Sequence, residues 1–163
     1  MSKYSTLNFT KDLCQAAKRE WEDIAGGDAF DLELSPVFSW VETHMDVAPN
    51  DSVALCLWNN DSKRTDAVVE IVDSRKGKLS KLLKVIPSPR FWDVNNVRGE
   101  IIQLYTEAFF NVITAGGFGS SRVVKLYGRD DEMMSILRSI HAAWTVSNST
   151  AEFEGRFLAI SLN

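Results

Sequence analysis

The carboxylate of Glu70 stands in the middle of an apolar run, Ala67–Asp73. A carboxylate in such a strand must be ion-paired, solvated in a cleft, or raised in pKa by the loss of water. His141 could also move a proton. Because it lies near the apolar face of a predicted helix, the alternative is a hydrogen-bonded boundary residue. His44 is the only other histidine and no HExxH spacing occurs, so we expect no metal site.

A second set of residues could bind an anion. The predicted strand Leu79–Ile86 ends at Pro87, because proline lacks the backbone donor that extends a ladder. The chain then turns and enters a predicted helix near Val94–Ala115. A helix N-terminus presents free N–H groups and the positive end of a dipole. Arg90 and Arg98 would add positive charge, so we expect this turn to be the candidate phosphate-binding segment.

Two other motifs have the wrong context for the chemistry they suggest. Gly116–Ser121 is rich in glycine, yet it follows a predicted helix and precedes a strand, the opposite polarity to a phosphate loop. We expect a flexible connector there. The cluster also lacks a Gly-x-Ser-x-Gly elbow, so a serine hydrolase is not supported. The three acids of Asp130–Glu132 open a predicted helix, where they complement its dipole.

The order of the predicted helices and strands restricts the possible folds more strongly than any single residue restricts the possible reactions. The run Val53–Trp58 is almost entirely apolar, which is typical of a central strand covered on both faces. An antiparallel meander followed by β-α-β-α-β indicates an α+β domain with a central mixed sheet and helices on both faces. The predicted elements are strands at Val53–Trp58, Ala67–Asp73 and Leu79–Ile86, a helix at Val94–Ala115, a strand at Val123–Tyr127, a helix at Asp130–Trp144 and a strand at Glu154–Leu162.

The first part of the chain predicts a strand and two helices. Tyr4–Phe9 has the pattern of a strand, and Thr10 is a plausible N-cap for a helix over Lys11–Ile24. Ser35 and Pro36 indicate a second N-cap, with proline in the first helical position of a shorter helix.

Length and composition predict one globular domain over residues 1–163, since 45% of the residues are hydrophobic. The formal charge of -4 gives no long-range attraction for nucleic acid or anionic lipid, and we expect neither as a partner. No apolar run approaches the ~18 residues that cross a bilayer, and no signal-peptide pattern opens the sequence. We therefore expect a cytoplasmic protein in which Cys14 and Cys56 are reduced and buried.

The same order of elements resembles the Gcn5-related N-acetyltransferase (GNAT) family. The strand end Leu83–Pro87, the helix opening near Asn95–Arg98 and the run Val124–Arg129 carry the resemblance. With Asp130–Met134 and Phe153–Leu158, these segments are similar to the small GNAT-like proteins that tailed bacteriophages encode. The resemblance covers most of the chain.

The resemblance implies an acyltransferase that moves an acetyl group from acetyl-CoA to an amine on a protein or a small molecule, with a host protein as one such acceptor. In this fold the strand at Leu79–Ile86 splays from its parallel neighbour at Val123–Tyr127, and the pantetheine arm of CoA lies in the gap. Glu70, with Asp73 second, would accept the amine proton. The implied CoA contacts are Lys84, Val85, Ile86, Arg90, Asn95, Asn96, Val97, Arg98 and Gly99, and the implied proton donors are Tyr127 and His141.

Two departures from the family pattern leave a second function open. The candidate phosphate loop has one glycine, Gly99, followed by the acidic Glu100, and the helix Asp130–Trp144 lacks the tyrosine that many members use. The alternative is a catalytically inactive GNAT-like protein that binds a host or virion protein. Clustered exposed aromatic residues mark interfaces. The candidates are Trp40, Phe91 and Trp92.

Overall fold

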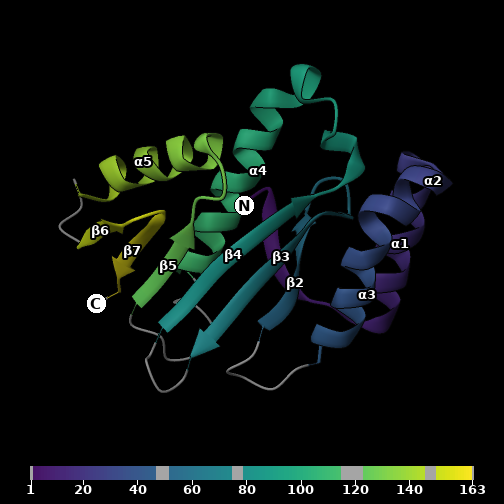
Figure 1. Ribbon diagram of the computed structural model, residues 1–163, viewed down its shortest axis with the longest axis horizontal. Coiled ribbons are helices and arrows are strands. Elements are labelled where there is room, and N and C mark those ends of the chain that lie inside the picture. Colours follow the sequence, from purple (N-terminus) through teal and green to yellow (C-terminus); the bar gives the residue numbers. More distant parts are fainter. Residues whose placement is uncertain (1, 47–51, 75–78, 115–122, 146–149, 163) are drawn as a thin grey trace.

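The structure is a computed structural model that describes residues 2–46, 52–74, 79–114, 123–145 and 150–162. Its frame is a seven-stranded sheet of order β1-β2-β3-β4-β5-β7-β6 (Figure 1). The neighbouring pairs are antiparallel, except that β4 and β5 run parallel. This confirms the mixed α+β architecture. The strands are β1 Tyr4–Asn8, β2 Ser52–Asn59, β3 Arg64–Ser74, β4 Leu79–Pro87, β5 Val123–Tyr127, β6 Ala151–Glu154 and β7 Phe157–Ser161.

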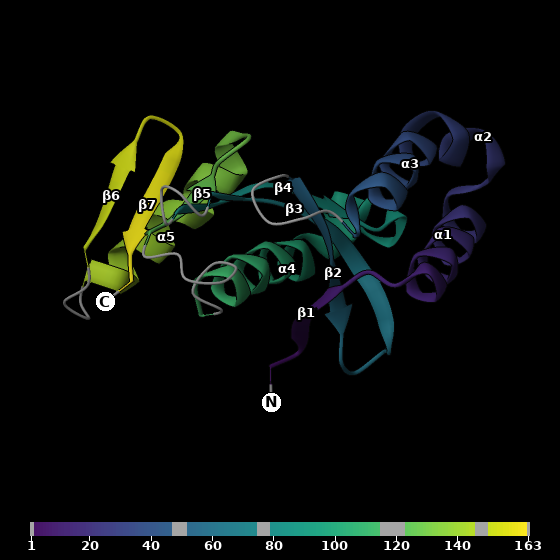
Figure 2. The same cartoon turned by 90° about the horizontal axis from the view of Figure 1, so that it is seen from below.

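Helices cover both faces of the sheet. Figure 2 shows α1, α2 and α3 on one side and α4 on the other, and α5 shares a core with α4. The helices are α1 Lys11–Ala25, α2 Gly27–Ala29, a π-helical turn at Phe30–Leu34, α3 Ser35–His44, a 3-10 turn at Pro89–Phe91, α4 Val94–Thr114 and α5 Asp131–Thr145.

The inner strand β2, second in the sheet order, separates two apolar cores. Leu55 and Leu57 belong to the core beneath α4 and α5, whereas Ala54 and Cys56 belong to the core beneath α1 and α3. All four side chains are buried, as the nearly continuous apolar run predicts. Cys14 is also buried, and both cysteines are free thiols.

Both predicted helices form, as α1 and α3, but the predicted cap of the second is wrong. Thr10 Oγ1 accepts a hydrogen bond of 3.1 Å from the Leu13 N–H, which confirms the N-cap. The predicted cap at Ser35 is wrong, because Ser35 is already helical (φ -56, ψ -42) and donates its N–H to the Phe30 carbonyl. Helical backbone begins at Gly27, because the chain upstream of Ser35 buries Phe30 and Leu34 against the α1 and α3 core.

The end of the chain is a hairpin. The sequence predicts one strand at Glu154–Leu162, whereas the structure has β6 and β7 antiparallel, with Glu154 opposite Phe157. Gly155 in the connection has φ +61, a conformation that glycine adopts without strain. At the start of α5, Asp130 Oδ1 accepts the Met133 N–H at 2.9 Å, which supports the capping role of that acid. The predicted connector Gly116–Ser121 and the side chain of Asp73 lie outside the described residues.

Candidate functional site

The sheet opens between β4 and β5. Their parallel register pairs Leu79–Leu82 with Val123–Leu126, and β4 then continues to Pro87 beyond the last paired residue. A register shift between Glu70 and Ile71 makes Leu83 an extra residue of β4, and such a bulge bends a strand. The register therefore leaves Lys84–Ile86 beyond the part of β4 that pairs with β5.

An open groove of about 840 Å³ lies beside the separated part of β4. It brings together residues from three distant parts of the chain, and it includes two of the predicted contacts, Lys84 and Ile86. The side chain of Val85 instead points into the α4 and α5 core, as alternation along a strand requires. The lining residues are Glu33, Leu34, Val37, Lys84, Ile86, Pro87, Trp92 and Arg129.

Glu33 reaches the groove through the π-helical turn. The bond from the Ser35 N–H to the Phe30 carbonyl spans five residues instead of four, so the helix is locally widened. Phe30 and Leu34 are buried on the sheet side, while Leu32, adjacent to Glu33, is 75% exposed. The turn therefore presents the Glu33 carboxylate to the groove and leaves Leu32 exposed to solvent.

Arg129 follows β5 directly and is held by the backbone before it. A Cβ on Gly128 would overlap the Met134 side chain and lie 3.2 Å from Leu137, so a larger residue here would force the Met134 side chain to move. The Gly128 N–H donates to the Arg156 carbonyl at 2.8 Å, and Arg156 Nε donates to the Gly128 carbonyl at 2.6 Å. These contacts fix the point from which the Arg129 side chain extends to the groove.

Glu70 and Lys84 form the ion pair that the sequence leaves open as an alternative. Lys84 Nζ lies 3.3 Å from Glu70 Oε2, and the two residues face each other in the β3–β4 register. Ser52 Oγ donates a hydrogen bond of 3.0 Å to Glu70 Oε1. Glu70 is only 8% exposed and does not line the groove, whereas Lys84 does. The carboxylate is thus committed to two partners within the sheet.

The start of α4 is broken at Val97, whose backbone angles are not helical (φ -123, ψ 17). Asn96 and Val97 donate their N–H groups to the Asp93 carbonyl at 3.1 and 3.3 Å, forming a turn before the break. A helix that restarts after Val97 directs the N–H groups of a new first turn outward. Arg98 is exposed on 74% of its side chain, and Gly99 has open space around its Cβ position.

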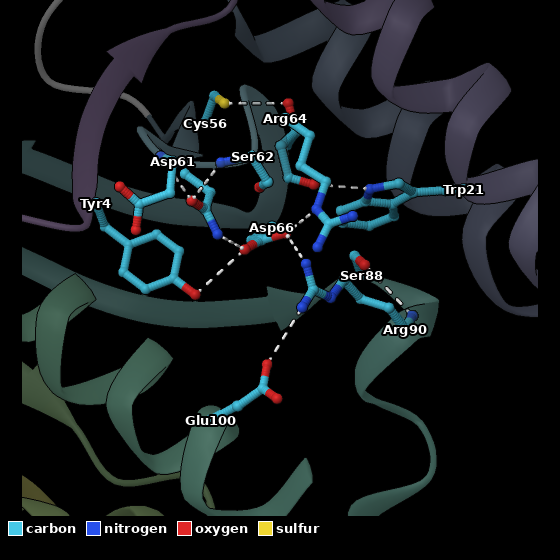
Figure 3. A network of polar contacts seen from close by, with 12 residues as sticks. Tyr4, Trp21, Cys56, Asp61, Ser62, Arg64, Asp66, Ser88, Arg90 and Glu100 are labelled. Atoms are coloured by element: carbon cyan, nitrogen blue, oxygen red, sulfur yellow. Dashed lines mark hydrogen bonds and ion pairs between the residues drawn. The ribbon is translucent and has the colours of Figure 1, made fainter.

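The Arg90 side chain is bound within the protein (Figure 3). Its Nη1 donates to Asp66 Oδ1 and its Nη2 donates to Glu100 Oε2, both at 3.2 Å. The predicted role of Arg90 was to attract phosphate directly, but these bonds give its guanidinium two carboxylate partners. They also place a positive charge beside Glu100. This acid adjoins the candidate phosphate turn, where its own negative charge would repel phosphate.

Asp66 is the centre of this network and is fully buried. Arg64 Nε donates to Asp66 Oδ1 at 3.2 Å, while the Tyr4 hydroxyl and Asn59 Nδ2 donate to Asp66 Oδ2 at 3.2 and 2.6 Å (Figure 3). Burial, followed by the Asp66 charge, raises the pKa of Tyr4 well above its usual value. Because Ser88 N also donates to the Asp66 carbonyl, the network fixes the segment that joins β4 to α4.

The two predicted proton donors lie in different places. Tyr127 is the last residue of β5, where β4 and β5 part, and its ring lies 4.9 Å from the Phe157 ring. His141 is on α5 and its Nε2 lies 3.0 Å from the Ala151 carbonyl of β6. Because β6 is the outermost strand beyond β5 and β7, the structure does not bring His141 to the groove.

Sequence patterns missed two charged residues of the groove and the surroundings of one tyrosine. Glu33 and Arg129 line the groove; Glu33 has no motif around it, and Arg129 ends the run Val124–Arg129, for which the sequence predicts no binding role. Tyr105 was part of the apolar stripe of a predicted helix. Burial, with the charges of Asp130 and Glu132, raises the pKa of Tyr105 to about 12. The charge of Arg129 opposes that rise in pKa, and Tyr105 itself is buried in the core beneath α4 and α5.

The described part of the chain contains neither a cluster of metal ligands nor a membrane-spanning helix. Within it, no three His, Cys, Asp or Glu side chains gather as metal ligands would. None of its helices combines the length and apolar character needed to cross a membrane.

Comparisons with known proteins identify the fold. No known protein family matches the sequence, and no curated protein matches it. A probable GNAT-family acetyltransferase from Chromobacterium violaceum superposes with a TM-score of 0.54 at 13% identity, over 99% of this chain and 82% of that one. A GNAT-family acetyltransferase from Bacillus anthracis gives 0.53 at 6% identity, over 98% of this chain and 92% of that one. The protein therefore has a GNAT-like fold.

Proposed function

We propose that this protein transfers an acyl group from an acyl-CoA, with acetyl-CoA as the expected donor, to an amine. The observation that carries the proposal is the separation of β4 from β5 after Leu82, which leaves a strand edge beside an 840 Å³ groove. An exposed strand edge offers N–H and C=O groups that can pair with an amide-containing chain. The pantetheine arm of CoA has two amides and suits such an edge.

In this proposal Lys84, Val85 and Ile86 provide the backbone edge for pantetheine. The turn Asn95–Gly99 receives the pyrophosphate, because the helix restarts after Val97 and has Arg98 exposed beside it. The open space at Gly99 permits a close approach to the backbone. Glu100, which would repel phosphate, has its charge offset by Arg90. The residues present therefore fit the donor.

The transfer itself needs a proton acceptor and a proton donor. The amine nitrogen attacks the thioester carbon, the C–N bond forms and the C–S bond breaks, and the leaving thiolate takes up a proton. We assign the acceptor role to Glu33, which lines the groove, ahead of Glu70, which is held by Lys84 and Ser52. We assign the donor role to Tyr127, at the point where the strands part. Tyr127→Phe should lower kcat by about a hundredfold or more, and an unchanged kcat would exclude the assignment.

Calorimetric titration with acetyl-CoA and CoA tests the donor site. We expect micromolar binding to the wild-type protein, strong weakening in Arg98→Glu, and no change in Arg138→Glu, which reverses an exposed charge on α5. No binding at millimolar CoA would overturn the proposal.

A second function is favoured by one observation. Trp92 is 44% exposed at the groove, as the hypothesis of a protein-binding surface predicts. Phe91 is buried, so that part of the hypothesis is wrong, and Trp40 is half-buried and stacks on His44. We therefore propose, as the alternative, a non-catalytic protein that binds a host or virion protein through the groove rim. A bacteriophage origin and a cytoplasmic location stay predictions. This alternative would be supported if the protein does not bind CoA but binds a host protein through Trp92.

A further inference from the structure

Two of the charged residues that line the groove have opposite signs and form no ion pair within the described part of the chain. Glu33 and Arg129 both line the groove, and neither forms an ion pair with another residue in the described ranges. The third charged lining residue, Lys84, is offset by Glu70 at 3.3 Å. The groove therefore presents one available carboxylate and one available guanidinium.

The two charges come from different elements, and the backbone next to each is fixed while their side chains are exposed. Glu33 is presented by the π-helical turn, whose neighbours Phe30 and Leu34 are buried. Arg129 follows Gly128, whose position is fixed by Arg156. A π-helical turn is frequent at functional sites. A carboxylate and a guanidinium held on separate elements can bind the two ends of one small molecule.

The rest of the lining is apolar. The remaining side chains are Leu34, Val37, Ile86, Pro87 and Trp92. Ligand sites commonly combine such walls with a few polar groups that fix orientation. A ligand suited to this groove carries an ammonium, a carboxylate and an apolar body.

We propose that the acceptor is a free amino acid with an apolar side chain, bound through its ammonium by Glu33 and through its carboxylate by Arg129. This inference rests on the proposed acyltransferase function and names the substrate class for the same site. Arg binds carboxylates in a planar, two-bond geometry, which Lys84 cannot reproduce.

The same geometry accounts for the protons of the reaction. The ammonium first gives one proton to Glu33, which passes it to solvent, and the free amine then attacks the thioester. The amine loses its second proton after the C–N bond has formed, and the leaving thiolate takes one proton from Tyr127, which the second amine proton replaces. The products are the N-acyl amino acid and CoA thiol. The acyl group neutralises the nitrogen, so the product loses the attraction of Glu33 and dissociates more readily.

Matched acceptors test the inference. L-phenylalanine and phenethylamine share the ring and the amine but differ in the carboxylate, and the release of CoA thiol from acetyl-CoA measures kcat/KM for each. We expect kcat/KM to favour L-phenylalanine by about tenfold or more, the effect of one hydrogen bond to a charged group. Arg129→Gln should reduce the ratio toward one, whereas Arg138→Gln, which changes an exposed side chain of α5, should leave it unchanged.

A binding measurement distinguishes failure of the acceptor inference from failure of the proposed CoA site. L-phenylalanine should bind to the CoA-loaded protein in calorimetry, and binding should weaken about tenfold in Arg129→Gln and in Glu33→Gln. Circular dichroism checks that the variants are folded. If CoA binds but phenethylamine is used as well as L-phenylalanine, or neither is acetylated, the acceptor inference is overturned and the donor site stands. If CoA does not bind, both fall.

Discussion

Arg90 joins Glu100 on α4 to Asp66 on β3, with its two terminal nitrogens each 3.2 Å from a carboxylate oxygen. Through Glu100 the guanidinium offsets a negative charge next to the turn that we assign to phosphate. Through Asp66 the same group is anchored to the buried centre of the sheet. Arg90 therefore connects the buried network that stabilises the fold with the charges around the proposed donor site.

Glu100→Gln should strengthen CoA binding. The substitution removes a half-exposed carboxylate near the phosphate turn and releases Nη2 of Arg90. Because the ion pair is partly exposed, we expect a change of about two- to fivefold in Kd. Calorimetry at low ionic strength measures it, and weaker binding would contradict the proposed position of the pyrophosphate.

Asp66→Ala should destabilise the protein strongly. The substitution leaves Arg64 and Arg90 facing each other without the carboxylate that both contact. Removing one partner of a buried pair costs about 3–5 kcal/mol, and we expect the lower end because both arginines are partly exposed.

Urea unfolding gives the change in the free energy of unfolding, and Asp61→Asn, an exposed acid nearby, is the control. The control should lie within about 0.5 kcal/mol of wild type. A loss below about 1 kcal/mol in Asp66→Ala would mean that the network contributes little.

Two glycine substitutions should change stability in opposite directions. Gly128→Ala places a methyl group on Met134 and Leu137, and we expect a loss of about 1–3 kcal/mol. Gly99→Ala meets no atom within 4 Å and lies in α4, so it should stabilise by about 0.5–1 kcal/mol. Thermal and urea unfolding measure both. If both variants changed the free energy of unfolding by the same amount, Gly128 would have to lie farther from α5 than in the structure.

Stability should fall in alkaline solution through Cys56. Burial raises the pKa of the Cys56 thiol from 9.0 to about 12. Between these pH values the thiol stays protonated in the folded protein but loses its proton in the unfolded chain. The contribution of Cys56 to stability is therefore full below about pH 9 and is lost as pH rises toward 12.

The slope from this group is at most about 1.4 kcal/mol per pH unit. Urea unfolding between pH 8 and 11 should show a shallower decline in Cys56→Ala than in wild type, since the other titrating groups are common to both. Parallel declines in the two proteins would show that the thiol is not held protonated.

The sequence predicted the sheet better than the site. The strands β3, β4 and β5 and the double-sided burial of β2 follow from local apolar patterns, which depend on neighbouring residues. The ion pair of Glu70 with Lys84 was foreseen as an alternative, because facing residues of neighbouring strands are natural partners.

The groove could not be predicted in the same way. It is assembled from Glu33, Trp92 and Arg129, which are far apart in the sequence and meet only through tertiary packing. The π-helical turn was missed because Ser35 and Pro36 have the local pattern of a helix start, whereas burial of Phe30 and Leu34 keeps the chain helical before them. The β6–β7 hairpin was missed because Glu154 and Phe157 lie within one strand-like run.

The most direct test of the account is amide hydrogen exchange along β4 with and without acetyl-CoA. Lys84–Ile86 lie beyond the pairing with β5, so exchange at their unpaired amides should slow when pantetheine binds. Ser80–Leu82 are paired with β5 in the free protein and serve as the internal reference. We predict slower exchange within Lys84–Ile86 and no change in the reference residues. Unchanged exchange at Lys84–Ile86 in saturating acetyl-CoA would contradict the claim that the separated strands form the donor site.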